Sequence, residues 1–131
     1  MGTYKNPQSV AIGSVAFTDV LEISSSCQRP EVVDPIADAE TYVKGASYGG
    51  GLRRGTITFR NPAAAKAAAG LIGTLTATLK GNGGAADKTL TIANIRLGGD
   101  DWNAGHDRTS TATVPWMAQS ADGTTDPETI A

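Results

Sequence analysis

Apolar and polar side chains alternate with a period of two through most of this chain. In the segment 55–60, for example, Ile57 and Phe59 alternate with two threonines and an arginine. A period of two matches the pleat of a β-strand, which points successive side chains to opposite faces of a sheet. The pattern predicts strands at 10–17, 20–23, 55–60, 75–80, 90–97 and 112–118. The chain is therefore expected to fold as a mainly β protein.

The alternation changes phase between Ile92 and Ile95. A β-bulge near Ala93–Asn94 would bring the apolar residues on both sides of this break to the core face. Pro115 lies inside the last predicted strand and has no backbone N–H to donate to a neighbouring strand. It therefore confines that strand to a sheet edge or to a bulge.

One segment has the pattern of a helix. Asn61 is a good N-cap, and Pro62 is favoured in a first helical turn. The next seven residues are six alanines and one lysine, and Gly70 is a natural stop. A helix of about two turns is unstable alone. We therefore expect the helix at about 62–70 to pack on the flank of the sheet through its alanine face.

The composition predicts a thin core for this sheet. The chain contains 20 alanines, 16 threonines and 16 glycines, but only seven aromatic residues. Its 131 residues suit a single domain, 1–131, and are enough to bury a core without disulfides. The expected fold is a β-sandwich or β-barrel with one short flanking α-helix, and partners are expected to supply part of its stability.

The segment 27–51 is a long excursion from the predicted strands. It contains two prolines, four acidic residues and three consecutive glycines, and only Tyr42 and Val43 resemble a strand. Long segments of this kind within a compact domain are usually functional or disordered. We expect a long loop or hairpin arm at 27–51, and a C-terminal tail at 120–131.

Hydropathy, cysteine count and charge exclude several classes of protein. No run approaches the ~20 apolar residues of a membrane-spanning helix, and the first residues lack a hydrophobic signal region. Cys27 is the only cysteine, so neither an intrachain disulfide nor a cysteine-built zinc site is possible. The net charge of −2 provides no basic excess for nucleic acid. We expect a soluble protein that is made in a reducing compartment and has no membrane partner.

The motifs of catalysis are incomplete. Gly45–Gly49 matches the G-x-S-x-G pattern of a hydrolase, but no helix pattern follows it, as a nucleophile elbow requires. The glycine-rich segment 49–55 lacks the lysine of a phosphate-binding loop and leads into a strand. The acidic segment 100–107 lacks the closing glutamate of a calcium loop and is expected to be a solvated loop. We expect no catalytic residue, cofactor or metal, and favour a structural or interaction module.

From about Gly55 onward, the features follow a distinctive order. A strand at 55–59 precedes the helix that begins after Asn61, and strands follow at 71–79, 88–97 and 113–118. The ending, 120–127, contains an Asp-Gly pair and then an Asp-Pro pair. This order resembles that of the tail tube and related tail structural proteins of bacteriophages.

The resemblance implies a virion protein without enzymatic activity. In such proteins, a β-sandwich or β-barrel with a flanking helix assembles as hexameric rings that stack into a hollow tube. A sheet from each subunit lines the channel, and a long loop reaches the neighbouring ring. The expected partners are copies of the chain and other tail proteins, with DNA passing the lumen without specific binding. The expected location is the phage tail, after synthesis in the host cytoplasm, and a head-tail, tube-end or baseplate role stays open.

The charges are segregated along the chain in a way that suits an assembly. Residues 19–40 and 100–131 are mainly acidic, whereas 44–96 contains eight basic residues and one acid. Such blocks either form complementary faces between copies or mix into ordinary surface pairs. We predict a contact between the acidic arm of one subunit and the basic block of its neighbour. The residues of this inter-subunit contact would be Glu31, Asp34, Asp38 and Glu40 on the arm, and Arg53 and Arg54 on the neighbour.

Two other classes stay open. A monomeric β-sandwich binding module, of the carbohydrate or adhesion type, would need exposed aromatics beside polar groups. Tyr42, Tyr48 and Trp102 are the candidates for that role. A calcium-dependent accessory domain of an enzyme would instead use the acidic segment 100–107. Measuring the oligomeric state would separate both classes from a tail subunit.

Overall fold

The computed structural model describes the backbone of residues 3–131 and the side chains of residues 7–107 and 109–131. Its single helix in this part of the chain is α1 (Pro62–Ala68). The strands are β1 (Thr3–Ile12), β2 (Val15–Ala16), β3 (Val20–Gln28), β4 (Glu31–Val33), β5 (Ala46–Tyr48), β6 (Leu52–Phe59), β7 (Ile72–Asn82), β8 (Lys88–Leu97), β9 (Asp101–Gly105), β10 (Arg108–Ala118) and β11 (Glu128–Ile130).

One large antiparallel sheet forms the body of the protein. Its strand order is β2-β1-β7-β8-β10-β6-β3, with β9 paired to β10 and β11 paired to β8. The sheet curls until β1 and β3 come into contact, but no hydrogen-bonded ladder joins these two strands in the described chain. The prediction of a mainly β, sandwich-like fold is therefore confirmed, and the barrel is not closed.

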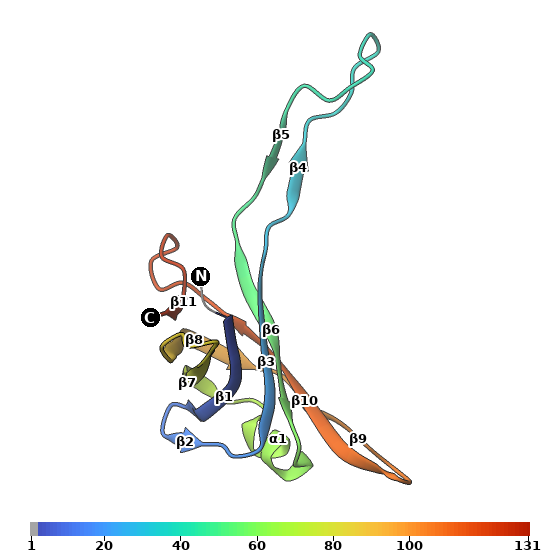
Figure 1. Cartoon of the computed structure of the whole chain (residues 1–131). Helices are drawn as coiled ribbons and strands as arrows, with labels where there is room; N and C mark the ends of the chain where they lie inside the picture. Colours follow the sequence, from blue (N-terminus) through green and yellow to red (C-terminus); the bar gives the residue numbers. More distant parts are fainter. Residues whose placement is uncertain (1–2) are drawn as a thin grey trace.

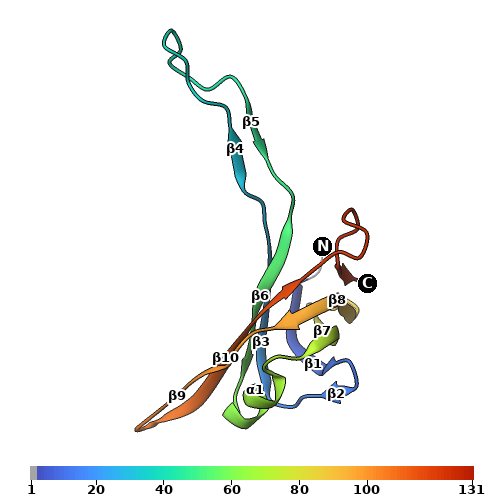
Figure 2. The ribbon, with the colours of Figure 1, turned by 180° about the vertical axis from the view of Figure 1, so that it is seen from behind.

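Two hairpins project from the body in opposite directions. Figure 1 shows β3 and β6 running out of the sheet into a long arm, which β4 and β5 form as a separate two-stranded sheet. The β9–β10 hairpin extends from the other end, and the view from behind in Figure 2 shows the same arrangement. The predicted arm is thus a hairpin. Its strands are not at Tyr42 and Val43, which lie in the tip, but nearer the body.

The core lies on the inner face of the curled sheet. Its largest buried side chains are Trp116 of β10 and Phe59 of β6, which are at most 2% exposed. The ring of Phe17 meets that of Phe59 edge-on, with 5.6 Å between centroids. Among the described residues, five alanines and nine larger aliphatic side chains complete the core.

The predicted bulge in β8 is confirmed. Leu75 of β7 pairs with Ile92 and Gly73 pairs with Ile95, so Ala93 and Asn94 together oppose one residue of β7. Asn94 has a φ of 53°, a left-handed conformation that asparagine tolerates better than most residues. The extra residue corrects the phase, and the apolar side chains before and after it are all buried.

Pro115 does not lie at a sheet edge, so the edge position predicted for its strand was wrong. Strand β10 is interior to the sheet, with β6 on one side and both β8 and β9 on the other. The carbonyl oxygen of Pro115 accepts a hydrogen bond from the N–H of Gly98, 2.8 Å away, where the chain bends between β8 and β9. The missing N–H of proline therefore falls where the pairing changes strands.

Helix α1 forms as predicted and packs against β10 and β6. The Asn61 side chain accepts a hydrogen bond from the N–H of Ala63 at 2.9 Å, and Pro62 occupies the first turn. Ala65 and Ala68 are fully buried in the core. Small side chains allow the helix to approach the sheet closely, which compensates for its short length.

Four predicted segments differ from the structure in detail. The segment 10–17 is not one strand but a hairpin of β1 and β2, because Gly13 turns the chain with a φ of 61°. The predicted solvated loop at 100–107 is mostly strand β9, paired with β10. The C-terminal tail, 120–131, ends in β11, which pairs with residues 90–92 of β8. The strand predicted at 20–23 continues to Gln28.

Candidate interaction surfaces

The arm is a hairpin with almost no core of its own. Backbone pairing joins Glu31 to Tyr48 and Val33 to Ala46, and the N–H of Gly49 donates to the carbonyl of Pro30 at the arm's base. Its large apolar side chains are nevertheless exposed, up to 83% for Tyr42. These side chains are Val32, Val33, Ile36, Tyr42, Val43 and Tyr48. A two-stranded hairpin is marginally stable in water, and exposed apolar side chains gathered in this way are typical of an interaction site.

The arm is also acidic, and most of its carboxylates lack a partner. Glu40 accepts a hydrogen bond from the N–H of Ala37 and lies 3.7 Å from the ammonium of Lys44. Glu31, Asp34 and Asp38 are exposed, and none of them forms an ion pair with any described residue. Three of the four predicted contact acids thus have no ion-pair partner among the described residues.

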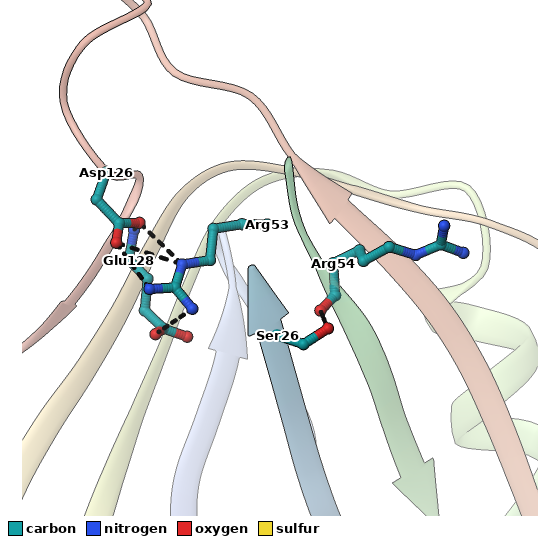
Figure 3. Close-up of polar contacts among 5 residues, drawn as sticks. All are labelled: Ser26, Arg53, Arg54, Asp126 and Glu128. Atoms are coloured by element: carbon teal, nitrogen blue, oxygen red, sulfur yellow. Dashed lines mark hydrogen bonds and ion pairs between the residues drawn. The ribbon is translucent and has the colours of Figure 1, made fainter. Parts of the chain in front are cut away.

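Arg53 is held inside its own chain. Its guanidinium donates three hydrogen bonds to the carboxylate of Asp126, the shortest at 2.8 Å, and lies 3.4 Å from the carboxylate of Glu128. Figure 3 shows Arg53 turned toward these two residues of the C-terminal tail. The hydrogen bonds from Arg53 hold the pKa of Asp126 below its usual value, and Asp126 raises the pKa of Arg53. Arg53 therefore ties the base of the arm to the tail.

Arg54 points away from Arg53, as Figure 3 also shows. Its backbone carbonyl accepts a hydrogen bond from the hydroxyl of Ser26, and its guanidinium donates to the side chain of Gln28 at 3.4 Å. No carboxylate of the described chain lies within ion-pair distance of Arg54. Of the two predicted basic contact residues, Arg54 is the one left available to a neighbour.

The tail loop before β11 is held by a carboxylate. One oxygen of Asp122 accepts hydrogen bonds from the N–H groups of Thr124 and Thr125 and from the hydroxyl of Ser120. These bonds, those from Thr125 first, hold the pKa of Asp122 well below its usual range. Residues 120–125 therefore form a hydrogen-bonded turn, after which the chain returns to the sheet as β11.

The outer face of the sheet carries a surface that the sequence interpretation missed. Across adjacent strands, Ile72 of β7 pairs with Arg96 of β8, Arg96 with Met117 of β10, and Met117 with Arg54 of β6. We call these four residues the outer row. Ile72 is 66% and Met117 52% exposed. Both are apolar residues at positions that alternate with the core residues of their strands. This departure from the polar outer pattern is visible in the sequence and could have marked the surface.

The aromatic residues proposed for a binding module lie apart. Tyr48 belongs to β5 and Tyr42 to the tip of the arm, whereas Trp102 lies in β9 on the opposite hairpin (Figure 1). All three are exposed. They do not form one stacking platform, and a single ligand would not meet all of them.

Ser47 of the hydrolase pattern lies in β5 on the arm, whereas His106, the one histidine of the sequence, lies in the turn of the β9–β10 hairpin. A serine–histidine pair is therefore not formed. Within residues 3–131, no three histidine, cysteine, aspartate or glutamate side chains are placed to hold a metal ion. None of the helices described is long and apolar enough to span a membrane. No protein-family model matches this chain, and no curated protein matches its sequence.

Proposed function

We propose that this protein is a virion structural protein, a bacteriophage tail tube subunit. It assembles through copies of itself into hexameric rings, which stack around a channel that DNA passes without specific binding. The order of sequence features supports this proposal, and so does the sandwich-like sheet with a flanking helix and a long arm. Its other partners would be tail proteins at the ends of the tube.

The arm is the observation that carries the proposal. It exposes six large apolar side chains and three unpaired carboxylates while adding none of its side chains to the buried apolar core of the described chain. A monomer would gain nothing from presenting such a surface to water. In an assembly, the arm would cover a neighbour and be covered by it.

The shape suits a head-to-tail contact. The two projecting hairpins lie at opposite ends of the body and differ in length, as Figures 1 and 2 show. Their sequences also differ. A contact between unlike surfaces of two copies is heterologous, and repetition of such a contact closes a ring or builds a filament. A tube of stacked rings contains both kinds of contact, because subunits close each ring and the arms connect one ring to the next.

The oligomeric state of the purified protein tests the proposal. Light scattering coupled to size-exclusion chromatography should show a mass that rises with concentration, and negative-stain images should show rings or tubes. End-on views would give the ring symmetry. A monomer at every concentration, with no particles larger than one chain, would contradict the proposal and favour the monomeric binding module.

A further inference from the structure

We propose that the outer row (Ile72, Arg96, Met117 and Arg54) is the surface on which the acidic arm of a second copy docks. This inference rests on the proposed self-assembly and names the surface that the arm meets. It differs from the contact predicted from sequence, because the structure engages Arg53 elsewhere and brings Arg96 and two apolar side chains beside Arg54.

The outer row is continuous across four strands. Residues that are directly paired on adjacent strands place their side chains on the same face, about 5 Å apart. Three successive pairings therefore make a strip of roughly 14 Å from Ile72 to Arg54. A two-stranded ribbon, with its strands about 5 Å apart, fits across such a strip.

The outer row combines basic and apolar side chains. Arg54 and Arg96 are exposed, and no carboxylate of the described chain lies within ion-pair distance of either. Met117 lies between the two arginines, and Ile72 lies beyond Arg96. A ligand for this strip needs carboxylates and apolar side chains together.

The arm has that combination. Val32, Val33 and Ile36 are about half exposed, and they lie among the unpaired acids Glu31 and Asp34. Glu31 and Val33 share one face of β4, because successive side chains of a strand alternate. Burial of Val33 against Met117 and Ile72 would remove apolar side chains from water, while the Glu31 carboxylate would lie near arginines that have no carboxylate partner in the described chain. Charge complementarity of this kind sets the orientation in which copies meet.

The arm reaches this surface only on another copy. It continues β3 and β6 outward from the body (Figure 1), and backbone pairing of Gln28 with Leu52 and of Pro30 with Gly49 holds it in that direction. Folding back onto its own outer row would break this pairing. The occupant is therefore the arm of a second chain.

A nucleic-acid backbone is the main competing occupant. Phosphates would use Arg54 and Arg96 but would leave the apolar side chains of Met117 and Ile72 uncovered. Nucleic-acid surfaces also add aromatic residues for base stacking, and the outer row has none. The mixture of apolar and basic groups favours a protein segment.

A charge-swap experiment tests the contact. One variant carries Arg54→Glu and Arg96→Glu, and the other carries Glu31→Arg and Asp34→Arg. Each alone should need at least about tenfold more protein to assemble, because like charges then face each other across the contact. An equal mixture of the two variants should assemble like the wild type, since each arm then meets a row of opposite charge. Arg60→Glu, an exposed arginine outside the row, is the matched control and should assemble normally.

The outcomes separate this inference from the proposed function. If the wild type stays monomeric, the proposed function fails. If the wild type assembles and the Arg54→Glu/Arg96→Glu variant assembles equally well, the outer row is not the docking surface. Two variants that each block assembly, without rescue on mixing, would show that arm and row do not meet each other. If the Arg54→Glu/Arg96→Glu variant assembles normally but no longer binds DNA that the wild type binds, the outer row is a nucleic-acid surface instead.

A second variant distinguishes loss of the contact from misfolding. Met117→Ser with Ile72→Ser leaves every charge in place and changes two exposed side chains. It should keep the melting temperature of the wild type and weaken assembly several-fold. Assembly at wild-type concentration would overturn the apolar half of the contact.

Discussion

At the scale of single residues, Arg53 and Arg54 are neighbours in sequence with different surroundings. A β-strand sends successive side chains to opposite faces, so one guanidinium lies over the C-terminal tail and the other lies on the outer face. Arg53 has two carboxylate partners, and Arg54 has none in the described chain. The same alternation that builds the core thus leaves Arg53 paired within the chain and turns Arg54 to the outer face.

Acid should loosen the tail by breaking the Arg53–Asp126 bridge. The pKa of Asp126 is lowered in the folded state, so its stabilisation is present above the ordinary value of 3.8 and is lost as pH falls through the lower folded pKa. Asp126→Asn should cause a similar loss at neutral pH, of about 0.5–1 kcal/mol, because the side chain is half exposed and screened by salt.

Hydrogen exchange at the end of the chain measures this effect. The N–H of Ala131 donates to the carbonyl of Thr89 at 3.0 Å, so its exchange reports whether the tail stays on β8. Asp126→Asn should speed this exchange, and Asp87→Asn, which breaks the separate pair with Lys80, should not. Equal exchange in all three proteins would show that Arg53 does not hold the tail.

Gly55 is required for another reason, because two strands and a large ring meet at its Cα. A Cβ there would collide with the backbone carbonyl of Ser24 and approach the Trp116 ring to 3.0 Å. Gly55→Ala should lower the free energy of unfolding by about 1–3 kcal/mol, as overpacking does in a core. Gly50→Ala is the control, since a Cβ at Gly50 meets no atom within 4 Å. Chemical denaturation compares the two, and equal stability would exclude the clash.

At the scale of elements, the bulge in β8 decides which residues enter the core. Without the extra residue, Ile95 and Leu97 would face solvent while Leu90 and Ile92 faced inward. The left-handed φ of 53° at Asn94 is the backbone cost of this correction. The bulge therefore lets the apolar residues of both halves of β8 face the same core.

Substitution of Asn94 tests the bulge directly. Asn94→Val should destabilise the protein by about 1–2 kcal/mol, because a β-branched residue is strained at positive φ. Asn94→Gly should change stability by less than about 0.5 kcal/mol, since glycine adopts this conformation freely and the asparagine side chain is exposed. Thermal unfolding distinguishes them, and a valine variant as stable as the glycine variant would contradict the assignment.

The projecting segments of the two hairpins, 31–48 and 100–107, differ from the core strands of the body because neither buries a large apolar side chain. Each contains a glycine and several charged residues, and the first also contains Pro35. They form strands because each segment pairs with a partner strand across a turn. Backbone pairing alone holds them out from the body.

At the scale of the whole molecule, the body and the arm have separable tasks. All the buried apolar residues of the described chain belong to the body. The arm, by contrast, supplies surface. The protein is therefore expected to fold without its arm and to fail in association.

Replacing residues 31–48 by Asn-Gly tests this division. Pro30 and Gly49 already face each other, so a two-residue turn should close the hairpin at the base of the arm. The shortened chain should keep a cooperative melting transition close to that of the wild type, while light scattering should show a monomer. Assemblies of normal size would exclude the arm as a contact, and an unfolded product would show that the arm supports the fold.

The local features of this protein were predictable from short stretches of its sequence. Period-two alternation located the main strands, the phase break located the bulge, and Asn61 and Pro62 located the start of the helix. These features depend on residues within a few positions of one another. The acidic character of the arm was equally readable, because charge is a property of composition.

The tertiary structure alone decided which residues meet. Arg53 and Asp126 are 73 residues apart, and no local pattern marks them as partners. Register across four strands brings Ile72, Met117 and the outer arginines into one row, although they are distant in sequence. Strand pairing at 31–48 and 100–107 overrode a loop-like composition in the same way. Local alternation sets the face on which a side chain lies, whereas its neighbours depend on strand order, and that order follows from burying one shared core.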